Sequence, residues 1–315
     1  MQIVYSSDEN YAQHMAVSMV SLFTTNNKVD SLTVYVISNG ITDETKEKLN
    51  NLAESYQRKI VWIDFKPYAQ KLLLNMEWHI SLSSYARLFI AEMLSDECER
   101  AIYLDCDTII CNDLTKLWEM DMKEHSVAGV LDLVRNDFEV RVGMCEEQPY
   151  INAGVLLINL KKWRETSIQD KLLGFIVERE GRVTHHDQGV INGVLNSDML
   201  KLPPEYNVMT PFFTFKYKKL VSFFDLKNYY TSEDINFAVT NPAIIHFTPE
   251  FVGRVWEIGC RHPKKNLYIE NLDKTCWKGN IGKAQPLPFK LKLLYWMYKN
   301  LPIVILNSIP RLRKK

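Results

Sequence analysis

The sequence lacks several features that would define a protein class at once. It contains six cysteines among 315 residues, and none forms a CxxC pair. This spacing fits neither a zinc module nor a disulfide framework, so we expect mostly buried, unpaired cysteines of a reducing compartment. No apolar run reaches the ~18 residues that a membrane span requires. The N-terminus has no charged leader followed by an apolar stretch, so the body is expected to be cytoplasmic.

Acidic residues are missing from the C-terminal end of the chain. The formal net charge is zero, with 38 basic and 38 acidic residues, which argues against a nucleic-acid-binding protein. After Asp273, however, ten Lys or Arg follow and no Asp or Glu, so residues 1–273 hold 28 basic and 38 acidic residues. A basic end on an acidic body indicates a surface with its own partner.

Short β-rich runs alternate with helical patterns from the first residue onward. Strands are predicted at 2–7, 31–38, 59–65 and 100–110, and helices at 10–26, 42–56 and 83–94. Alternation of this kind implies βαβ units with right-handed crossovers, and therefore a Rossmann-like, mostly parallel α/β sheet flanked by helices. Later strands are predicted at 126–133, 153–160 and 242–248, with one long helix over 160–180.

Two carboxylates interrupt the predicted fourth strand. In "YLDCDTIICND", Asp105 and Asp107 stand one residue apart after an apolar run. Two unpaired charges at the end of a buried strand are costly, so we expect a cationic group between them. Asp8 and Asn10 follow the first predicted strand. Because ligands bind at the carboxyl ends of parallel strands, all four residues are expected at one edge of the sheet.

The acidic pair has three interpretations. It forms two solvated turn carboxylates, or it is the DxDxT motif of a dehalogenase-like phosphatase, with Asp105 as nucleophile and Asp107 as acid/base. In the third, it holds a divalent cation against a nucleotide diphosphate, as in sugar-nucleotide transferases. The phosphatase nucleophile normally lies on the first strand of its domain. Here three βα units precede the pair and no later GDxxxD-type cluster follows, which favours the third interpretation.

Several segments, taken in order, resemble glycosyltransferase family 8, the retaining GT-A enzymes that include bacterial lipooligosaccharide galactosyltransferases, lipopolysaccharide glucosyltransferases and glycogenin. The resemblance covers most of residues 1–280. It is carried by "VYSSDENY", "HISLSSYARLFIAEML", "AIYLDCDTIICNDLTKLWEMDM", "YINAGVLLINLKKWRE", "HHDQGVINGVL", "LPPEYNVM" and "IIHFT". The pair "YLDCDTIICNDLTKLW" and "NAGVLLINLKKWR" is far more specific than the acidic pair alone.

The resemblance implies a GT-A fold, a UDP-sugar donor and a metal site. Asp105, Asp107 and His246 would bind Mn²⁺, or Mg²⁺, and these ligand types suit Mn²⁺. Asp8 and Asn10 match the positions that contact the uracil and ribose, although Asp8 also suits a helix N-cap. The remaining matches to donor contacts are Arg87, Asn152, Asp187 and Gln188. The adjacent histidines 185 and 186 are not expected to form a separate metal site, since they point in different directions on a helix.

The segment after His246 departs from the family pattern, which has a Gly three residues on and then Lys-Pro-Trp. This chain has "HFTPEFVGRVWEIGC", in which Pro249 replaces the Gly and Trp256 is kept. Gly253 is expected to take over the role of the missing glycine, and Arg254 to grip the diphosphate in place of the Lys. A guanidinium suits that role but differs from an ammonium in reach and geometry.

The resemblance also implies transfer with retention of the α configuration. Gln188 matches a residue near the reactive face of the sugar, and an amide is a poor nucleophile. Front-face transfer, in which the departing phosphate oxygen helps to deprotonate the acceptor, is therefore favoured. Asp187 as a transient nucleophile is the alternative. Asp132 is expected to contact the acceptor.

We expect a GT-A catalytic domain over 1–260 and an extension over 261–315. Residues 1–100 form its nucleotide-binding half, and 101–260 its metal, donor-sugar and acceptor half. The extension combines aromatic residues with Lys and Arg, which suits an anchor on the inner face of an anionic membrane near a lipid-linked acceptor. Packing on its own domain or on another subunit is the alternative. Two functional alternatives are a catalytically silent relative that binds sugar nucleotides and a self-glucosylating protein.

Overall fold

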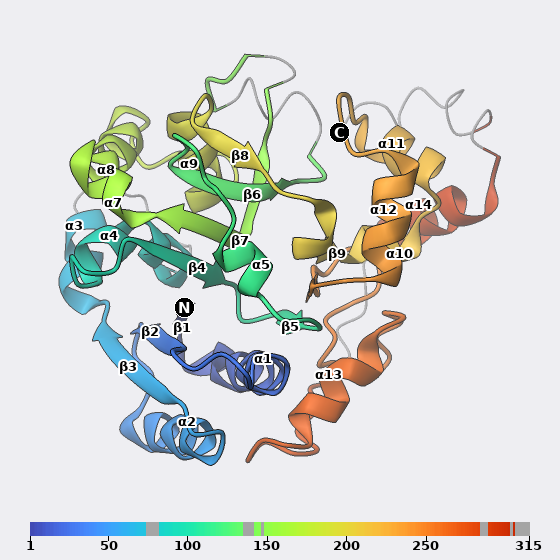
Figure 1. The fold of residues 1–315 in the computed structure, drawn as a ribbon. Coiled ribbons are helices and arrows are strands. Elements are labelled where there is room, and N and C mark those ends of the chain that lie inside the picture. Colours follow the sequence, from blue (N-terminus) through green and yellow to red (C-terminus); the bar gives the residue numbers. More distant parts are fainter. Residues whose placement is uncertain (74–81, 135–141, 146–147, 284–288, 303–304, 306–315) are drawn as a thin grey trace.

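A seven-stranded sheet forms the centre of the molecule (Figure 1). The computed structural model describes residues 1–73, 82–134, 142–145, 148–283, 289–302 and 305. The strand order is β3-β2-β1-β4-β7-β6-β8. Their bounds are β1 Gln2–Ser7, β2 Thr33–Ser38, β3 Lys59–Asp64, β4 Arg100–Leu104, β6 Val127–Leu131, β7 Ile151–Asn159 and β8 Met199–Lys201. All pairings are parallel except that β7 runs antiparallel to both β4 and β6, which confirms the predicted mostly parallel sheet.

The helices cover both faces of this sheet, as right-handed crossovers require. The first two crossovers use α1 (Ala12–Thr25) and α2 (Asp43–Ser55), which pack on each other on one face. On the other face, η2 (Leu82–Phe89) contacts β1 and α9 (His186–Leu195), and α9 contacts β7. The flanking elements there are α3 (Lys66–Leu73), α4 (Ile90–Met93), α7 (Leu160–Glu165) and α8 (Ile168–Glu178).

The core lies between these layers and consists of central strands buried on both sides. Ile3, Val4 and Tyr5 of β1 have no exposed surface, and the hydroxyl of Tyr5 lies 2.9 Å from Ser18 Oγ. A buried phenol needs such a partner, because an unpaired hydroxyl inside a core is costly. Continuous burial along β1 and β4 fixes where these strands end, and therefore where polar residues can emerge.

The predicted strand over 100–110 is in fact two strands in two sheets. β4 ends at Leu104, and β5 (Thr108–Ile110) belongs to a second sheet with the order β5-β10-β9. The other members are β10 (Ile244–His246) and β9 (Val208–Met209). The intervening residues 105–107 therefore form the crossing from one sheet to the other, and β5 pairs antiparallel with β10 so that Thr108 lies opposite His246.

Two helix predictions are also wrong in detail. The helix predicted over 160–180 is broken into α7 and α8, because Ser167 takes a left-handed backbone with φ of 51°. In α7, Arg164 donates hydrogen bonds to the carbonyls of Ala91 and Cys98, which fixes α7 on the preceding connection. The helix predicted over 83–94 starts as a 3₁₀ helix and becomes α-helical only at Ile90.

All six cysteines are free, but only Cys98 and Cys106 are buried, so the prediction that most are buried is wrong.

The C-terminal third adds helices at the side of the molecule opposite β3 (Figure 1). These are α10 (Thr210–Thr214), α11 (Tyr217–Phe224), α12 (Ser232–Thr240), α13 (Lys265–Leu272) and α14 (Phe289–Asn300); short elements elsewhere are η1 (Glu9–Tyr11), α5 (Thr115–Trp118) and η3 (Pro204–Tyr206). α13 packs on α1, where the hydroxyl of Tyr268 lies 2.7 Å from His14 Nδ1. No helix within the described ranges is long and apolar enough to cross a membrane. The domain boundary at 260/261 stays a prediction.

Candidate functional site

A cavity of about 250 Å³ opens at the carboxyl edge of β1 and β4. It is lined by Ser6, Ser7, Asp8, Tyr11, Ser83, Ser84, Arg87, Tyr103, Asp105, Cys106, Asp107 and Arg254. Both parallel strands deliver the residues that follow them to this edge. β7 runs in the opposite direction, so its first residues, 151–154, reach the same edge. Five of the predicted residues, from four distant parts of the chain, line this cavity: Asp8, Arg87, Asp105, Asp107 and Arg254.

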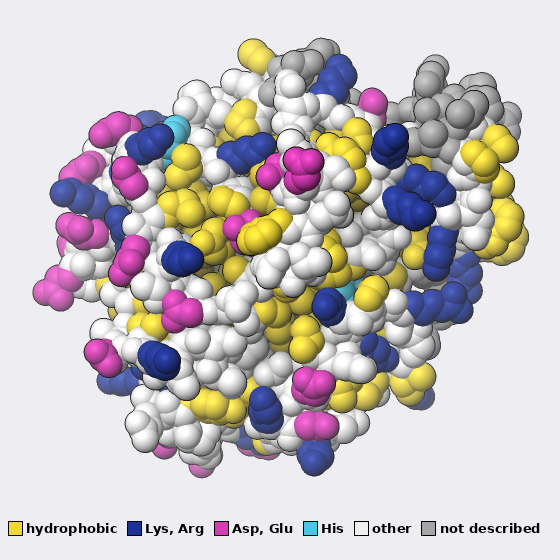
Figure 2. Space-filling model, turned by 45° about the vertical axis from the view of Figure 1, so that its right-hand side comes forward, with side chains coloured by type: hydrophobic (Ala, Val, Ile, Leu, Met, Phe, Trp, Pro, Cys, Tyr) yellow, Lys and Arg dark blue, Asp and Glu magenta, His cyan; other side chains and the backbone are white. Residues whose placement is uncertain are grey.

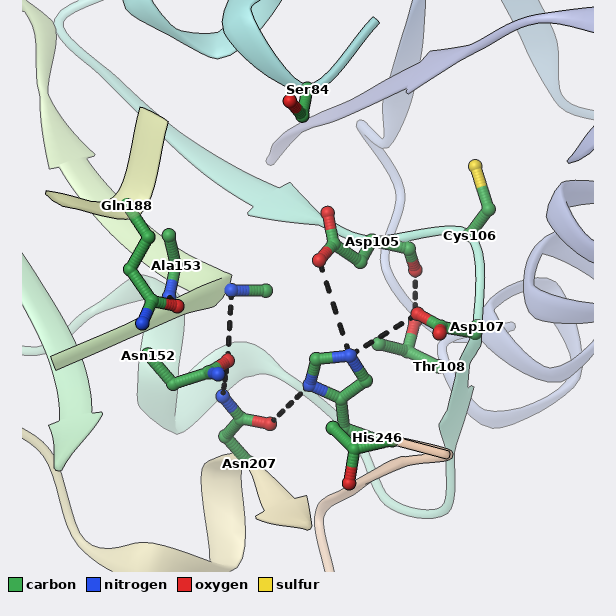
Figure 3. A network of polar contacts seen from close by, with 12 residues as sticks. Ser84, Asp105, Cys106, Asp107, Thr108, Asn152, Ala153, Gln188, Asn207 and His246 are labelled. Atoms are coloured by element: carbon green, nitrogen blue, oxygen red, sulfur yellow. Dashed lines mark hydrogen bonds and ion pairs between the residues drawn. The ribbon is translucent and has the colours of Figure 1, made fainter. Parts of the chain in front are cut away.

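Two carboxylates and one imidazole converge beside this cavity (Figure 3). His246 Nε2 lies 3.2 Å from Asp107 Oδ1 and 4.0 Å from Asp105 Oδ2. One ligand atom from each residue lies within 4.8 Å of the other two, and no other such group of three occurs in the part of the chain that is described. Three hard or borderline ligand atoms at this spacing fit a divalent cation. Histidines 185 and 186 are not members of this group.

A chain of hydrogen bonds fixes the orientation of the His246 ring. The backbone N–H of Gly154 donates to Asn152 Oδ1, which also accepts from Asn207 Nδ2. Because the Nδ2 end of Asn207 is used in this way, its Oδ1 atom, which can only accept, faces the ring and lies 3.1 Å from His246 Nδ1. The proton must therefore sit on Nδ1, and in the neutral ring Nε2 keeps its lone pair for a cation. Asn207 was not predicted from sequence, although it lies in the segment "LPPEYNVM".

Electrostatics around the carboxylate and imidazole favour their charged forms. Burial raises the pKa of Asp107, but His246 and Arg254 outweigh that effect and lower it below its ordinary value. Burial likewise lowers the pKa of His246, and the neighbouring carboxylate of Asp107 more than reverses this. The site is thus built for a positive charge next to Asp107.

Gly154 leaves the space that His246 occupies. A Cβ atom at this position would lie 2.3 Å from His246 Cε1 and 2.9 Å from Asp105 Oδ2. Both atoms belong to buried or half-buried parts of the cluster, so neither can move away cheaply. A glycine is therefore required here because of a close approach, and the sequence alone did not reveal it.

Arg87 is buried between two carboxylates and is not on the surface, where an arginine is usually found. It donates to Asp105 Oδ1 at 2.9 Å and to Asp187 Oδ2 at 2.8 Å, and it also contacts the carbonyl of Ala153. Its guanidinium carbon stacks 4.3 Å from the ring centre of Tyr103, whose hydroxyl donates to Asp105 Oδ1 at 3.0 Å. Oδ1 of Asp105 is therefore fully engaged, and Oδ2 is left to face His246.

Hydrogen bonds join Gln188 of α9 to β7 and to Asp132, the predicted acceptor residue, which directly follows β6. Gln188 Oε1 accepts from the N–H of Ala153 at 3.0 Å, and its Nε2 donates to Asp132 Oδ2 at 2.6 Å. Asp187, next to it, is buried. Burial raises the pKa of Asp187, and the Arg87 guanidinium only partly offsets this. The structure thus brings Asp132 and Gln188 together, an association for which the sequence offered no signal.

The loop after His246, where the sequence departs from the family pattern, places Arg254 against the cluster. Gly253 has a φ of 78°, a left-handed conformation that glycine adopts without steric cost. Arg254 Nη1 then lies 3.1 Å from Asp107 Oδ2, and its guanidinium carbon lies 5.3 Å from the ring centre of Trp256. Trp256 is itself stacked on His14 at 3.7 Å. The left-handed backbone at residue 253 therefore gives a structural reason for a glycine at this position.

We expect substitutions of Arg254 to separate charge from geometry. Arg254→Ala should weaken metal-dependent binding of a nucleoside diphosphate about tenfold, roughly 1.4 kcal/mol, because the family resemblance assigns this guanidinium to the diphosphate. Arg254→Lys should recover most of that affinity, since it restores the positive charge. Titration calorimetry with UDP measures both. Equal affinity of the alanine variant and the unchanged protein would contradict a role for Arg254.

Asp8 and Asn10 occupy different environments. Asp8 lines the cavity and accepts hydrogen bonds from the N–H groups of Asn10 and Tyr11, so it caps η1 as predicted. The side chain of Asn10 is exposed and is not among those that line the cavity. Tyr11 does line it and was not predicted. It could have been predicted from its position three residues after Asp8, because residues one helical turn apart lie on the same side.

Comparisons with known proteins agree with this geometry. The profile of the family described as "Glycosyl transferase family 8" matches residues 2–252. General stress protein A of Bacillus subtilis (strain 168) is 28% identical over 280 residues, covering 88% of this chain and 94% of that protein. Lipopolysaccharide 1,2-glucosyltransferase of Escherichia coli (strain K12) is 29% identical over 310 residues, covering 94% and 84%.

Solved structures agree on the fold. A crystal structure of the galactosyltransferase LgtC, in complex with donor and acceptor sugar analogs, matches with a TM-score of 0.74 at 23% identity. The match covers 92% of this chain and 98% of that chain. The bifunctional glycosyltransferase WbbM matches with a TM-score of 0.72 at 21% identity, covering 95% of this chain and 51% of that chain. These likenesses confirm the predicted GT-A fold.

Proposed function

Because this chain belongs to glycosyl transferase family 8 and is therefore a glycosyltransferase, we propose that it moves glucose or galactose from a UDP-sugar to a sugar of a cell-surface glycan, such as lipopolysaccharide core. One observation carries the proposal: the cluster of Asp105, Asp107 and His246 lies beside a cavity that also holds Arg87 and Arg254. Cationic groups on both sides of a metal-type site suit a diphosphate.

We assign Asp105, Asp107 and His246 to Mn²⁺, with Mg²⁺ as the alternative. An imidazole in the ligand set favours Mn²⁺, because Mg²⁺ is bound mainly by oxygen ligands. When bound, the cation neutralises charge on the departing diphosphate. Asn207 and Asn152 hold the imidazole so that its free nitrogen faces the carboxylates. Arg87 and Tyr103 hold Asp105 so that one oxygen faces the same point.

In this proposal, the other residues bind different parts of the donor. Asp8, Asn10 and Tyr11 contact the nucleoside, and the tyrosine ring offers a face for the base. Gly253 and Arg254 hold the diphosphate. Contacts with the donor sugar are assigned to Arg87, Asn152, Asp187 and Gln188. The support is their convergence at one edge of the sheet, through the hydrogen bonds that join Arg87 to Asp187 and Gln188 to β7.

The environment of Asp187 favours front-face transfer. A transient nucleophile needs a free carboxylate, whereas Asp187 is buried, has a raised pKa and is paired with Arg87. Gln188 is held at both ends of its amide. In front-face transfer, the bond from the anomeric carbon to the phosphate oxygen breaks as the acceptor oxygen bonds to that carbon. The acceptor proton passes to the departing phosphate oxygen, and Asp132 orients the acceptor hydroxyl.

A lipid-linked acceptor and a peripheral position on the inner face of the membrane complete the proposal. The support is the name of the Escherichia coli relative and the composition of residues 261–315. α14 packs on the domain through Tyr295 and Tyr298, so packing on the chain itself, the alternative, is realised in part. Its other aromatic side chains are exposed, with 79% for Phe289 and 55% for Trp296. The basic residues 311, 313, 314 and 315 lie outside the described residues. Co-sedimentation with anionic vesicles tests this position.

The first experiment is UDP release by the purified protein from a panel of UDP-sugars, with Mn²⁺ or with EDTA. We expect slow release from one donor, abolished by EDTA. Release of phosphate from phosphomonoesters instead would support the phosphatase alternative. Mn²⁺-dependent binding of UDP without release from any donor, even with glycan acceptors added, would support the silent relative. Mass added to the protein itself would identify self-glucosylation.

A further inference from the structure

A second concave site lies apart from the donor cavity, between α14 and the loop 251–261. It is a groove of about 590 Å³ whose walls include Phe251, Arg261, Lys292, Tyr295, Trp296 and Lys299. The donor cavity shares none of these side chains. The two sites are nevertheless neighbours in sequence, because the loop that forms one wall of the groove also carries Arg254.

One face of α14 forms the other wall. Lys292, Tyr295, Trp296 and Lys299 follow the i, i+3, i+4, i+7 spacing that puts side chains on a single helical stripe. The two lysines stand about 10 Å apart along the helix axis, given a rise of about 1.5 Å per residue. The stripe therefore presents a positive group at each end and aromatic rings between them.

Contacts between aromatic rings join the two walls of the groove. Phe251 has a φ of 60°, an unfavourable conformation for a bulky side chain, which persists only where the surroundings enforce it. Its ring stacks on Tyr295 at 5.3 Å with an angle of 7° between the planes, and it meets Phe223 at 5.4 Å. On the same helix, Tyr298 is buried and its ring lies 4.4 Å from that of Phe223. The two walls are thus fixed relative to each other.

The charge of the groove favours an anion. Arg261, Lys292 and Lys299 are exposed, whereas Glu257, the acidic residue among those that line it, is buried. A further cation lies at the end of α14, where Lys219 Nζ donates to the carbonyl of Lys299 at 2.9 Å. No acidic residue follows Asp273 anywhere in the sequence. The lining therefore carries three basic side chains and one acidic side chain, and this excess of positive charge favours an anionic group.

Exposed apolar side chains lie in the groove and farther along α14. Ile258 and Trp296, which line the groove, are 59% and 55% exposed, and Leu293 and Phe289, three and seven positions before Trp296 on α14, are 46% and 79% exposed. Figure 2 shows hydrophobic side chains beside Lys and Arg on the side of the molecule where α14 lies. Large apolar side chains left in water next to a cationic groove match a ligand that is anionic at one end and apolar at the other.

We propose that this groove binds the phosphate-bearing headgroup of a single anionic membrane lipid. The phosphate lies between Lys292, Lys299 and Arg261, and the acyl chains leave over Trp296 and Leu293. This goes beyond the transfer reaction and rests on one part of the proposed function, the position at a membrane surface. It differs from a diffuse basic anchor because it requires a discrete, saturable site.

The test uses a short-chain phosphatidylglycerol below its micelle concentration, titrated calorimetrically into the full-length protein. We expect saturable one-to-one binding, no binding of the matching phosphatidylcholine, and much weaker binding of inorganic phosphate. Lys292→Gln with Lys299→Gln should weaken lipid binding at least about tenfold, since each basic group near a lipid phosphate contributes. The control, Lys161→Gln with Lys171→Gln, removes the same charge from exposed positions on α7 and α8 and should bind normally.

Three results would overturn the groove as a lipid site. One is equal weakening in both double variants, because that indicates overall charge. Another is inorganic phosphate binding as tightly as the lipid. The last is binding to anionic vesicles without binding of the monomeric lipid, which indicates only a diffuse anchor. Mn²⁺-dependent UDP binding is measured on the same preparation to keep the two proposals apart. If UDP does not bind, the donor site is contradicted. If UDP binds and the lipid does not, only the lipid site in the groove is contradicted.

Discussion

Asp107→Asn should abolish measurable Mn²⁺-dependent binding of UDP and lower UDP-sugar turnover roughly 10²–10³-fold, the scale for removal of one electrostatic stabiliser of a transition state. Asp107 faces His246 with one oxygen and Arg254 with the other, so in the proposed site it serves both the cation cluster and the diphosphate clamp. The amide is nearly isosteric, so the loss should come from charge and not from packing. Titration calorimetry with UDP, with Mn²⁺ and then with EDTA, measures it.

The matched control is Asp30→Asn, which removes one exposed carboxylate far from the cluster in sequence. It should bind UDP and turn over donor like the unchanged protein. Circular dichroism should show that both variants are folded. Wild-type affinity for UDP in Asp107→Asn, with Mn²⁺ dependence intact, would refute the assignment of this carboxylate to the cation.

Arg87→Met should cost about 3–5 kcal/mol of unfolding free energy, the scale for breaking a buried ion pair from one side. The side chains of Arg87 and Asp187 are only 6% and 7% exposed, so the substitution leaves a carboxylate in a dry environment without its partner. Asp105 loses one of its two donors at the same time. Urea unfolding followed by tryptophan fluorescence measures the change.

A double substitution separates the ion pair from simple packing. Arg87→Met combined with Asp187→Asn should recover at least about 1 kcal/mol of the loss, because no buried charge is then left unpaired. As a surface comparison, Lys48→Met breaks an exposed pair with Glu44 and should leave the free energy of unfolding nearly unchanged. A loss in Arg87→Met as small as that of Lys48→Met would show that the buried pair does not stabilise the fold.

Local pattern was sufficient for the parallel half of the fold. Strands β1 to β3 and helices α1 and α2 each carry their own periodicity, and α2 also has a local cap, because the hydroxyl of Thr42 accepts from the N–H of Thr45 at its start. The second sheet was not predictable in this way. It pairs Thr108 with His246, residues distant in sequence, and a short strand of three residues carries too little pattern to reveal its partner.

The site shows the same division. The acidic pair and the histidine were proposed because carboxylates at a strand end and a resemblance to one family pointed to them. Asn207, Tyr103 and Gly154 were missed, because each matters through one contact: a hydrogen bond to a ring nitrogen, a hydroxyl on a carboxylate, and an absent Cβ. Contacts of this kind depend on three-dimensional approach, which the order of residues does not state.

The strained Phe251 also limits how the loop 248–261 could be exchanged between related proteins. Its left-handed backbone is compatible with the chain only while Tyr295 and Phe223 cover its ring, and both lie outside the loop. A chimera that grafts residues 248–261 onto a related scaffold would therefore import Arg254 without the side chains that support its loop. The transferable unit is the loop together with α11 and α14, so donor handling and C-terminal architecture are expected to be inherited as one module.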